Sequence, residues 1–469
     1  MDVFELGFGR TVQEIIIDRL PVQGRLPGWL NGTLIRNGPG TFKVGEQNYR
    51  HWFDGLSMLH KFSFTNGQVS YANKFLDCQA YNQAMEQGRI AFSEFATDPC
   101  QTLFGRVKTV FNPKVTDSAK VSIAKIASEY VALAETPIQV AFDPETLKST
   151  GVHSYEKNLA GQMTTVHPHF DKNRYEAYNL VTRYHRVSHY NIYSLGKTWK
   201  PERLASIPVN QPAYMHSFGM TQNYFILTEF PLVVNPLSLL LWLNPYIENF
   251  KWKPGRGTPI WVIDRRDGKV IGRYESEPFF AFHHINAFER GDEIFLDIAA
   301  YEDASILKAY YLESLKQSTT ELPFGKLRRY RIPLKGQRAE YEIISHACME
   351  LPNFDYARYN LDQSYRYVYA VSLHPEQRTG FYNQIVKVDI QTRQDISWHK
   401  AGCFPGEPIF VGQPGRKEED DGVILSVVLD SMRGNSFLLV LDAHSFEEIA
   451  RAEIPHPVLF GYHGAYFSA

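Results

Sequence analysis

The chain repeats one unit seven times: a short apolar strand, a polar turn and a second strand that runs back beside the first. Asn66-Gly67 and Asp267-Gly268 form the clearest turns, because these residue pairs adopt the backbone angles of tight hairpins. The first strands of the seven hairpins span residues 59–64, 138–142, 189–195, 260–264, 327–332, 384–390 and 436–442. Almost no long amphipathic helix lies between them. The repeat therefore predicts an all-β fold with radially arranged hairpins, a seven-bladed β-propeller.

A histidine or a glutamate follows each hairpin before the next one begins. The histidines are His167, His216, His283 and His463, and the glutamates are Glu135, Glu350 and Glu407. If each residue opens the innermost strand of the next blade, all seven converge on the propeller axis. For any one position, a surface or salt-bridged residue is an equally good interpretation. The agreement of all seven positions favours a shared site.

Four imidazoles that meet at one point predict a metal centre. Imidazole nitrogens suit Fe, Zn, Cu or Ni, and carboxylates commonly accept the ring N–H groups that point away from such a metal. Structural zinc sites are usually rich in thiolate, so a four-histidine set disfavours structural zinc. An octahedral Fe(II) with four histidines would leave two positions open, as in a non-haem oxygenase.

One apolar run raises the question of membrane contact. The 18 residues from Phe230 to Ile247 carry no charge. Three prolines interrupt the run, and each removes a backbone donor that a membrane-spanning helix needs. A short helix in the bilayer interface fits better, with Lys251 and Lys253 beside the lipid headgroups. A buried core helix is the alternative.

Charge and cysteine content narrow the class of protein further. The formal net charge of −2 over 469 residues provides no basic surplus, so we expect no nucleic-acid partner. The four cysteines form no CxxC pair and are expected to be reduced thiols. The N-terminus lacks the basic and apolar segments of a secretion signal. We therefore expect a cytoplasmic protein that associates peripherally with membranes.

Motifs along nearly the whole chain are similar to those of the carotenoid cleavage oxygenases, a family of carotenoid and apocarotenoid dioxygenases that includes the retinoid isomerohydrolase. These motifs are NGTLIRNGPG (31–40), HWFDG (51–55), VHPH (166–169), YMHSFG (214–219), FHHINA (282–287), GEPIFV (406–411), EEDDG (418–422) and GYHG (461–464). The resemblance implies a single seven-bladed propeller over residues 1–469, with a loop and helix cap over its top face. It also implies cap and membrane-docking insertions at about 76–130 and 228–256.

The resemblance assigns roles to the site residues. It implies one Fe(II) per chain bound by the four histidines, with the three glutamates holding three of the imidazole rings. In the aromatic strand around Phe282 it makes His283 the ligand and turns His284 away. Side chains alternate between the faces of a strand, but this alternation alone leaves open which of the two histidines reaches the axis. The segment from Phe230 to Phe250 is expected to dock on a membrane and admit lipid-soluble substrates.

The implied activity is cleavage of a conjugated C=C bond in a carotenoid or apocarotenoid by O2, giving aldehydes such as retinal or other apocarotenals. Retinoid-ester isomerohydrolysis and cleavage of a stilbene-type alkene are alternatives within the family. A propeller that only binds a carotenoid or a partner is the non-enzymatic alternative. The compact length resembles bacterial members, such as those of cyanobacteria. Residues 119–122 depart from the Asn-rich segment near the oxygen-binding side of many relatives.

Overall fold

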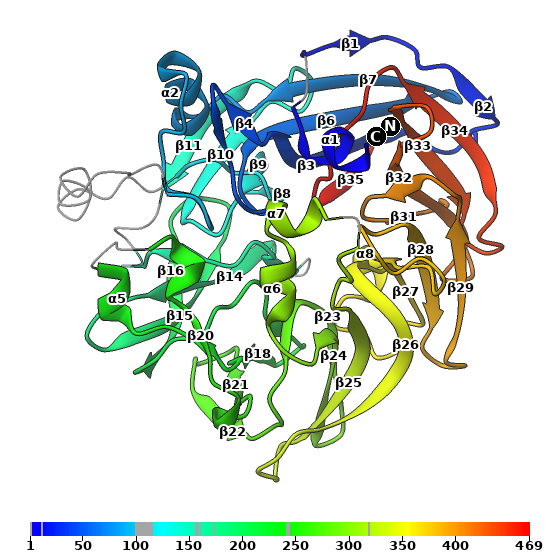
Figure 1. The fold of residues 1–469 in the computed structure, drawn as a ribbon. Helices are drawn as coiled ribbons and strands as arrows, with labels where there is room; N and C mark the ends of the chain where they lie inside the picture. The colour runs from blue at the N-terminus through cyan, green and yellow to red at the C-terminus, as the bar shows by residue number, and fades with distance from the viewer. Residues whose placement is uncertain are drawn as a thin grey trace.

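A computed structural model describes residues 2–10, 13–98, 116–154, 159, 161–171, 174–240, 244–317 and 319–469. In this part of the chain, six sheets of four to seven strands surround a central axis, and two further sheets have two strands each (Figure 1). Pairing between neighbouring strands is antiparallel throughout the six sheets. The predicted all-β propeller is confirmed.

All seven predicted hairpins are present, and six of them lie toward the outer side of a sheet, whereas the fifth lies in the middle of the seven-stranded sheet. Their strand pairs are β6 (Leu56–Thr65) and β7 (Gln68–Phe75), β10 (Ile138–Phe142) and β11 (Ser149–Ser154), β15 (Ser188–Leu195) and β16 (Glu202–Val209), β21 (Ile260–Asp264) and β22 (Val270–Tyr274), β25 (Gly325–Pro333) and β26 (Glu340–Asn353), β28 (Gln384–Asp389) and β29 (Gln394–His399), and β33 (Asn435–Asp442) and β34 (Glu448–Ile454).

The strands nearer the axis precede these hairpins in the chain, apart from the C-terminal strand. They are β3 (Gly32–Thr41), β8 (Ser122–Ile126), β9 (Glu129–Leu133), β12 (Met163–Thr164), β13 (His169–Asp171), β14 (Glu176–Arg183), β17 (Gly219–Met220), β18 (Tyr224–Thr228), β23 (Phe280–Arg290), β24 (Glu293–Tyr301), β27 (Tyr367–Ser372), β30 (Cys403–Pro405), β31 (Ile409–Gly412), β32 (Gly422–Asp430) and β35 (Gly464–Ser468). Inner strands such as β23 and β32 are almost continuously buried, whereas outer strands such as β16 expose more of their side chains. The inner strands are therefore covered on both faces by neighbouring sheets.

One sheet has seven strands, in the order β23-β24-β25-β26-β27-β28-β29. The first part of β26 pairs with β25, and its last residues pair with β27, where Glu350 lies opposite Val371. Dividing this sheet at β26 gives two four-stranded units and a total of seven blades. The number of blades depends on this division and stays a prediction.

The two ends of the chain interlock to close the ring. The C-terminal strand β35 pairs with β3, and the N-terminal strand β2 (Val22–Gly24) pairs with β34. A further short strand, β1 (Ile16–Ile17), covers the outer side of β7. Each end of the chain thus adds a strand to a sheet formed mainly by the opposite end. Main-chain hydrogen bonds between these strands join the two ends of the chain and close the ring.

Short helices and two small hairpins cover one end of the ring. Figure 1 shows α6 (Ser305–Ala309) and α7 (Leu312–Leu315) near the centre of the view, in front of the inner strands. The remaining short elements are α1 (Val3–Phe8), α2 (Gln79–Gln87), α5 (Pro236–Leu240), α8 (Tyr356–Tyr359), η1 (Tyr246–Asn249), η2 (Pro254–Arg256), β4 (Lys43–Val44) with β5 (Gln47–Asn48), and β19 (Leu232–Val233) with β20 (Lys251–Trp252). In the predicted insertion 76–130, residues 99–115 lie outside the described residues. The end of this range includes β8, which is a strand of the four-stranded sheet β11-β10-β9-β8.

The charge-free run does not form one continuous helix. Phe230, Val234 and Phe250 are buried in the core, and the helix between them, α5, has five residues. Leu237 on α5 exposes 60% of its surface, while residues 241–243 lie outside the described residues. Within the described chain, no helix is both long and apolar enough to cross a bilayer. Membrane docking through this run stays a prediction.

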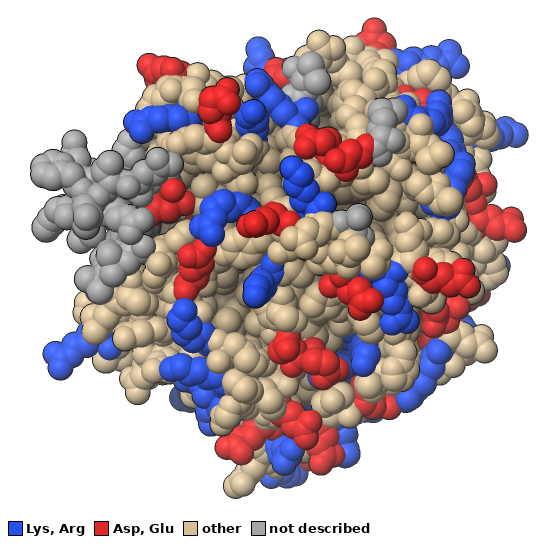
Figure 2. Space-filling model, viewed as in Figure 1, with Lys and Arg blue, Asp and Glu red and all other residues tan. Residues whose placement is uncertain are grey.

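Charged side chains of both signs are interspersed over the face shown in Figure 2. This mixture agrees with the small net charge of −2. Cys78, Cys348 and Cys403 are buried free thiols, and Cys100 lies outside the described residues.

Candidate metal centre

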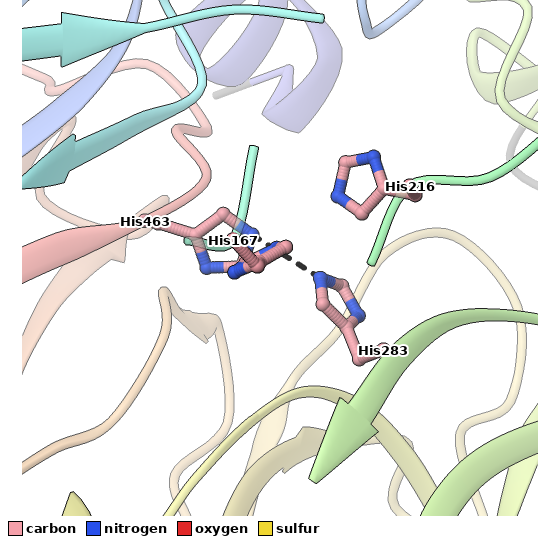
Figure 3. Close-up of side chains that lie close together, drawn as sticks. All are labelled: His167, His216, His283 and His463. Carbon is pink, nitrogen blue, oxygen red and sulfur yellow. Dashed lines mark hydrogen bonds between the residues drawn. The ribbon is translucent and has the colours of Figure 1, made fainter. Parts of the chain in front are cut away.

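Four histidines from four different sheets meet on the axis (Figure 3). His167 lies between β12 and β13, His216 precedes β17, His283 is in β23 and His463 directly precedes β35. One ring nitrogen of each histidine lies within 4.8 Å of the corresponding nitrogen of every other. The structure thus brings together the four histidines that the hairpin pattern singled out.

Only one histidine of the FHHINA motif reaches the axis, and it is His283. The register between β23 and β24 shifts between Ala281 and His284 and again between His284 and Asn286. Neighbouring side chains of the strand still point to opposite sides at this point. The two ring nitrogens of His284 lie 2.7 Å from Ser217 Oγ and 2.8 Å from Thr228 Oγ1, and His284 is not part of the four-histidine group.

Glu350 and Glu407 orient two of the imidazole rings. Nδ1 of His283 donates to Glu350 Oε1, and Nδ1 of His463 donates to Glu407 Oε1 at 2.8 Å. Burial is the largest single influence and raises the pKa of both carboxyl groups, but the contacts with His283 and His463 and with the other donors together lower the pKa of Glu350 and of Glu407 below the usual value. Both carboxylates are therefore held ionised against their imidazoles.

Each of these two carboxylates also accepts hydrogen bonds from two further donors. Tyr301 donates its hydroxyl to Glu350 Oε2, and the main-chain N–H of Leu351 lies 3.0 Å from Oε1. Arg36 and the N–H of Gly464 both donate to Glu407 Oε2. A buried carboxylate with three donors is well fixed in position.

Glu135 orients the imidazole ring of His216 in the same way. Its Oε1 accepts from His216 Nδ1 at 2.7 Å and from the hydroxyl of Tyr214 at 2.5 Å. Glu135 follows β9, the second strand of its sheet, while β8 is the innermost. The expectation that Glu135 opens an innermost strand was therefore wrong, because a cap segment and β8 precede it in the chain. The carboxylate nevertheless reaches one of the four imidazoles.

His167 differs from the other three histidines. Its Nε2 is buried and has no hydrogen-bond partner among the described residues. Burial, followed by the neighbouring His463, His216 and His283, lowers the pKa of His167 well below its usual value. Burial also lowers the pKa of His216, and it lowers the pKa of His463 to about 4 although Glu407 opposes the shift. These rings are therefore neutral near pH 7 and offer lone pairs.

The arrangement of ring nitrogens fits a cation. Because Nδ1 of His283 and of His463 each donate to a carboxylate, both rings carry their lone pair on Nε2. These two Nε2 atoms lie 3.2 Å apart. Two lone pairs that face each other at this distance repel, whereas a metal ion between them would bind both. The unpartnered Nε2 of His167 points to the same conclusion.

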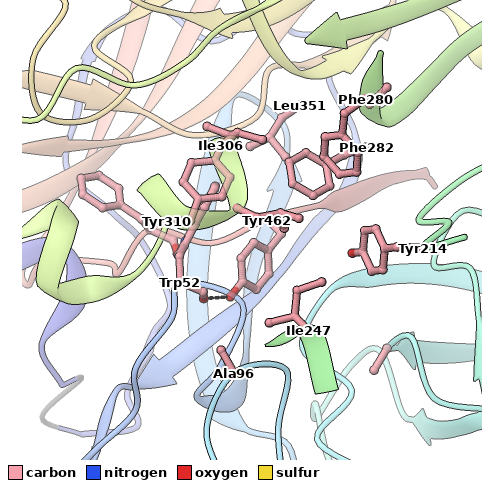
Figure 4. Close-up of a cluster of buried hydrophobic side chains, with 14 of the residues drawn as sticks. Trp52, Ala96, Tyr214, Ile247, Phe280, Phe282, Ile306, Tyr310, Leu351 and Tyr462 are labelled. Carbon is pink, nitrogen blue, oxygen red and sulfur yellow. Dashed lines mark hydrogen bonds between the residues drawn. The ribbon is translucent and has the colours of Figure 1, made fainter. Parts of the chain in front are cut away.

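Three of the histidines, His216, His283 and His463, form part of the wall of a cavity of about 340 Å³. Its wall is largely apolar and contains many aromatic rings, several of which are packed together in Figure 4. The aromatic residues that line it include Trp52, Phe53, Phe95, Phe282, Tyr310 and Tyr462. A cavity of this kind holds an apolar molecule through contact area and places it beside the polar groups at the site.

Sequence reasoning missed the groups that hold the glutamates. Tyr214 and Arg36 lie inside the motifs YMHSFG and NGTLIRNGPG, so a signal for them was present. Tyr301 lies at the end of β24, outside any motif, and its contact with Glu350 became visible only in the fold.

The chain is similar to known proteins over nearly its whole length. The model of the retinal pigment epithelial membrane protein family matches residues 8–468. Human β,β-carotene 15,15′-dioxygenase is 34% identical over 98% of this chain and 94% of its own, and the carotenoid isomerooxygenase of Galleria mellonella is 34% identical over 97% and 95%. A solved variant of Synechocystis apocarotenoid oxygenase has a TM-score of 0.89 and 26% identity, covering 99% of this chain and 98% of that one. The chain therefore belongs to the retinal pigment epithelial membrane protein family, the family of the carotenoid cleavage oxygenases.

Proposed function

We propose that this enzyme uses Fe(II) and O2 to cleave a conjugated C=C bond of a carotenoid or apocarotenoid, giving two aldehyde products. The observation that carries the proposal is the group of four imidazoles that meet on the axis, three of which line a largely apolar cavity. The similarity to a β-carotene dioxygenase and to apocarotenoid oxygenases supports the substrate class.

His167, His216, His283 and His463 would hold the iron. Their donor set of four nitrogens without thiolate suits Fe(II). The solved structures similar to this chain include a cobalt-substituted Synechocystis apocarotenoid oxygenase, with a TM-score of 0.88 and 25% identity. Bound Fe(II) would supply the activation of dioxygen.

The protein's own residues would prepare the site for this chemistry. Glu135, Glu350 and Glu407 hold three imidazoles in the tautomer whose lone pair faces the axis. The aromatic wall would position the polyene and exclude water, so the location of each double bond relative to the histidines would select the bond that is cut. None of these residues needs to transfer a proton to the substrate.

The test is anaerobic loading of the purified protein with Fe(II), followed by incubation with β-carotene or an apocarotenal in the presence of O2. We expect about one iron per chain and two aldehyde products, identified by chromatography and mass. The variant His216→Ala should lose both iron and activity. Unchanged pigments with iron-loaded protein would contradict the proposal.

The same assay with other substrates distinguishes the alternative functions. Retinol formed from a retinyl ester without O2 would indicate an isomerohydrolase, and aldehydes formed only from a phenolic stilbene would indicate that substrate class. A protein that binds pigment without stoichiometric iron, and that is unaffected by His216→Ala, would be a carotenoid-binding propeller.

We also infer that the enzyme associates peripherally with membranes through the segment from Phe230 to Phe250. The exposed Leu237 on α5 supports this inference, and the exposed Lys251 is suited to contact with lipid headgroups. The protein should sediment with anionic lipid vesicles, and Leu237→Glu should reduce the bound fraction. The matched surface change Ile271→Glu, on β22, should leave binding unchanged. Equal binding by all three proteins would argue against this segment. The cytoplasmic location stays a prediction.

A further inference from the structure

A buried ion pair lies in the wall of the cavity. Lys120 Nζ donates to Glu94 Oε2 at 2.6 Å, and both residues line the cavity. Lys120 is 4% exposed and Glu94 is 5% exposed. The hydroxyl of Thr116 donates to the other carboxylate oxygen at 2.7 Å. Lys120 lies in the segment 119–122, where the sequence departs from the Asn-rich pattern expected from the family resemblance.

The Lys120 ammonium retains unused hydrogen-bonding capacity. An ammonium has three N–H donors, and Glu94 is its one acceptor among the described residues. A second buried lysine provides the contrast. Lys387 Nζ donates to Asp420 and also to the carbonyl oxygens of Ala443 and His444. Lys387 is therefore saturated by the protein, whereas Lys120 can still donate to a molecule in the cavity.

Stability alone does not account well for this pair. Taking two charges out of water costs free energy that their attraction often fails to recover, and well-packed apolar residues are commonly as stable or more so. Burial raises the pKa of Glu94, with Lys120 opposing that shift, which reflects the same penalty. A buried charge with spare donors in a ligand-sized cavity is a candidate binding group.

The pair lies close to the metal centre. The carbonyl oxygen of Val121, the residue after Lys120, accepts from the main-chain N–H of His463 at 3.1 Å. On the other side, the ring of Phe95, the residue after Glu94, is 5.3 Å from Phe53 between centroids, and Phe53 is 6.3 Å from the His216 ring. A molecule in this cavity can therefore contact the ion pair and the histidines together.

We propose that Lys120, held in place by Glu94, binds the oxygen atom at the polar end of an apocarotenoid substrate. This inference rests on the proposed function and names the substrate class within it. A terminal carbonyl accepts a hydrogen bond from Lys120, and a terminal hydroxyl can also donate to Glu94. A hydrocarbon carotene offers neither contact. Anchoring one end would also fix the number of carbons between that end and the cleaved bond.

The test compares oxygen-bearing and hydrocarbon substrates in one double variant. Lys120→Met alone leaves the buried Glu94 carboxylate without its ion-pair partner and destabilises the fold, so it is combined with Glu94→Gln. The control replaces the saturated pair, as Lys387→Met with Asp420→Asn. For each iron-loaded protein, kcat and KM are measured with a long-chain apo-carotenal, the corresponding apo-carotenol and β-carotene, and the products are identified by mass.

Loss of a charge-assisted hydrogen bond should lower the ratio of kcat/KM for the apo-carotenal over β-carotene by about tenfold to a hundredfold, mainly through KM. The aldehyde should also be cut at more than one bond. The apo-carotenol should follow the apo-carotenal, and the control pair should keep the wild-type ratio. An equal effect on all substrates, or none, would overturn the inference and leave a structural role for the pair.

A binding measurement separates this inference from the proposed function. If the wild-type enzyme cleaves no pigment, the proposed function fails, but quenching of tryptophan fluorescence still reports binding. Tighter binding of the apo-carotenal by wild-type protein than by the double variant would then support Lys120 as the binding group. Equal binding by the two proteins would overturn it.

Discussion

Replacing Glu350 by glutamine tests how the carboxylate prepares the metal centre. Glu350 Oε1 accepts from His283 Nδ1 and from the N–H of Leu351, while Oε2 accepts from Tyr301. Glutamine has nearly the same size and can place its amide oxygen at the Oε1 position, so the two donors there remain satisfied. Its NH2 group then faces the Tyr301 hydroxyl, which can rotate to become an acceptor. Glu350→Gln should therefore fold.

The expected loss is in metal affinity. The anionic acceptor makes His283 a stronger base at Nε2, and a neutral amide gives up this charge assistance. Changes to a carboxylate that holds a ligating histidine typically cost tenfold to a hundredfold in metal affinity. This corresponds to about 1.4 to 2.8 kcal/mol. Activity at saturating iron should fall less than the affinity does.

The affinity is measured by anaerobic titration of metal-free protein with Fe(II) in competition with a chelator. Glu229→Gln is the matched control, because Glu229 is also buried and accepts from Trp261 and Arg256 instead of a histidine. Thermal unfolding of the metal-free proteins shows whether the two changes disturb folding equally. Wild-type affinity in Glu350→Gln, with the control also unchanged, would refute the role assigned to the carboxylate.

Three further predictions concern the histidines and one close main-chain contact. His463→Ala and His167→Ala should both abolish stoichiometric iron, but in metal-free protein His463→Ala should lower the free energy of unfolding by about 1–3 kcal/mol more, because it leaves Oε1 of the buried Glu407 without its donor, whereas the Nε2 of His167 has no partner to lose; equal unfolding midpoints in urea would contradict this. Burial lowers the pKa of His60 from 6.5 to about 3, so the unfolded chain binds the proton first and stability falls by about 1.4 kcal/mol per pH unit as the pH drops below 6.5. His60→Gln should reduce the measured slope of unfolding free energy against pH by that amount, and an unchanged slope would show that His60 is not buried in its neutral form. A methyl group on Gly38 would lie 2.6 Å from the Cα atom of Gly461, so Gly38→Ala should shift the GYHG segment and weaken iron binding, whereas Gly28→Ala, with open space around it, should not, as iron titration would show.

The hairpins were predictable because they are local. Turn residues such as Asn66-Gly67 and the alternation of the flanking strands depend on a few neighbouring positions, so each outer strand pair could be identified without knowledge of the whole. The repeat then placed His167, His216, His283 and His463 at corresponding points, and this is why the metal centre could be anticipated.

The pairing of groups within the site depended on contacts between residues far apart in the chain. Arg36 and Glu407 are 371 positions apart, and His216 and Glu135 are 81 apart. No local period contains such pairs, since they form only when several sheets close into a ring. The choice between His283 and His284 also needed the fold, because alternation along a strand places the two side chains on opposite faces without indicating which face lies toward the axis.

The sequence alone thus determined the repeated hairpins, the all-β class and the set of residues near the axis, because all of these follow from local turn chemistry and side-chain patterning. Only the tertiary structure decided which carboxylate holds which imidazole, that Tyr301 and Arg36 support them, and that the Lys120–Glu94 pair lies in the wall of the same cavity. The physical reason is that hydrogen-bond partners and cavity walls are set by how distant strands approach one another, which the pattern along the chain does not contain.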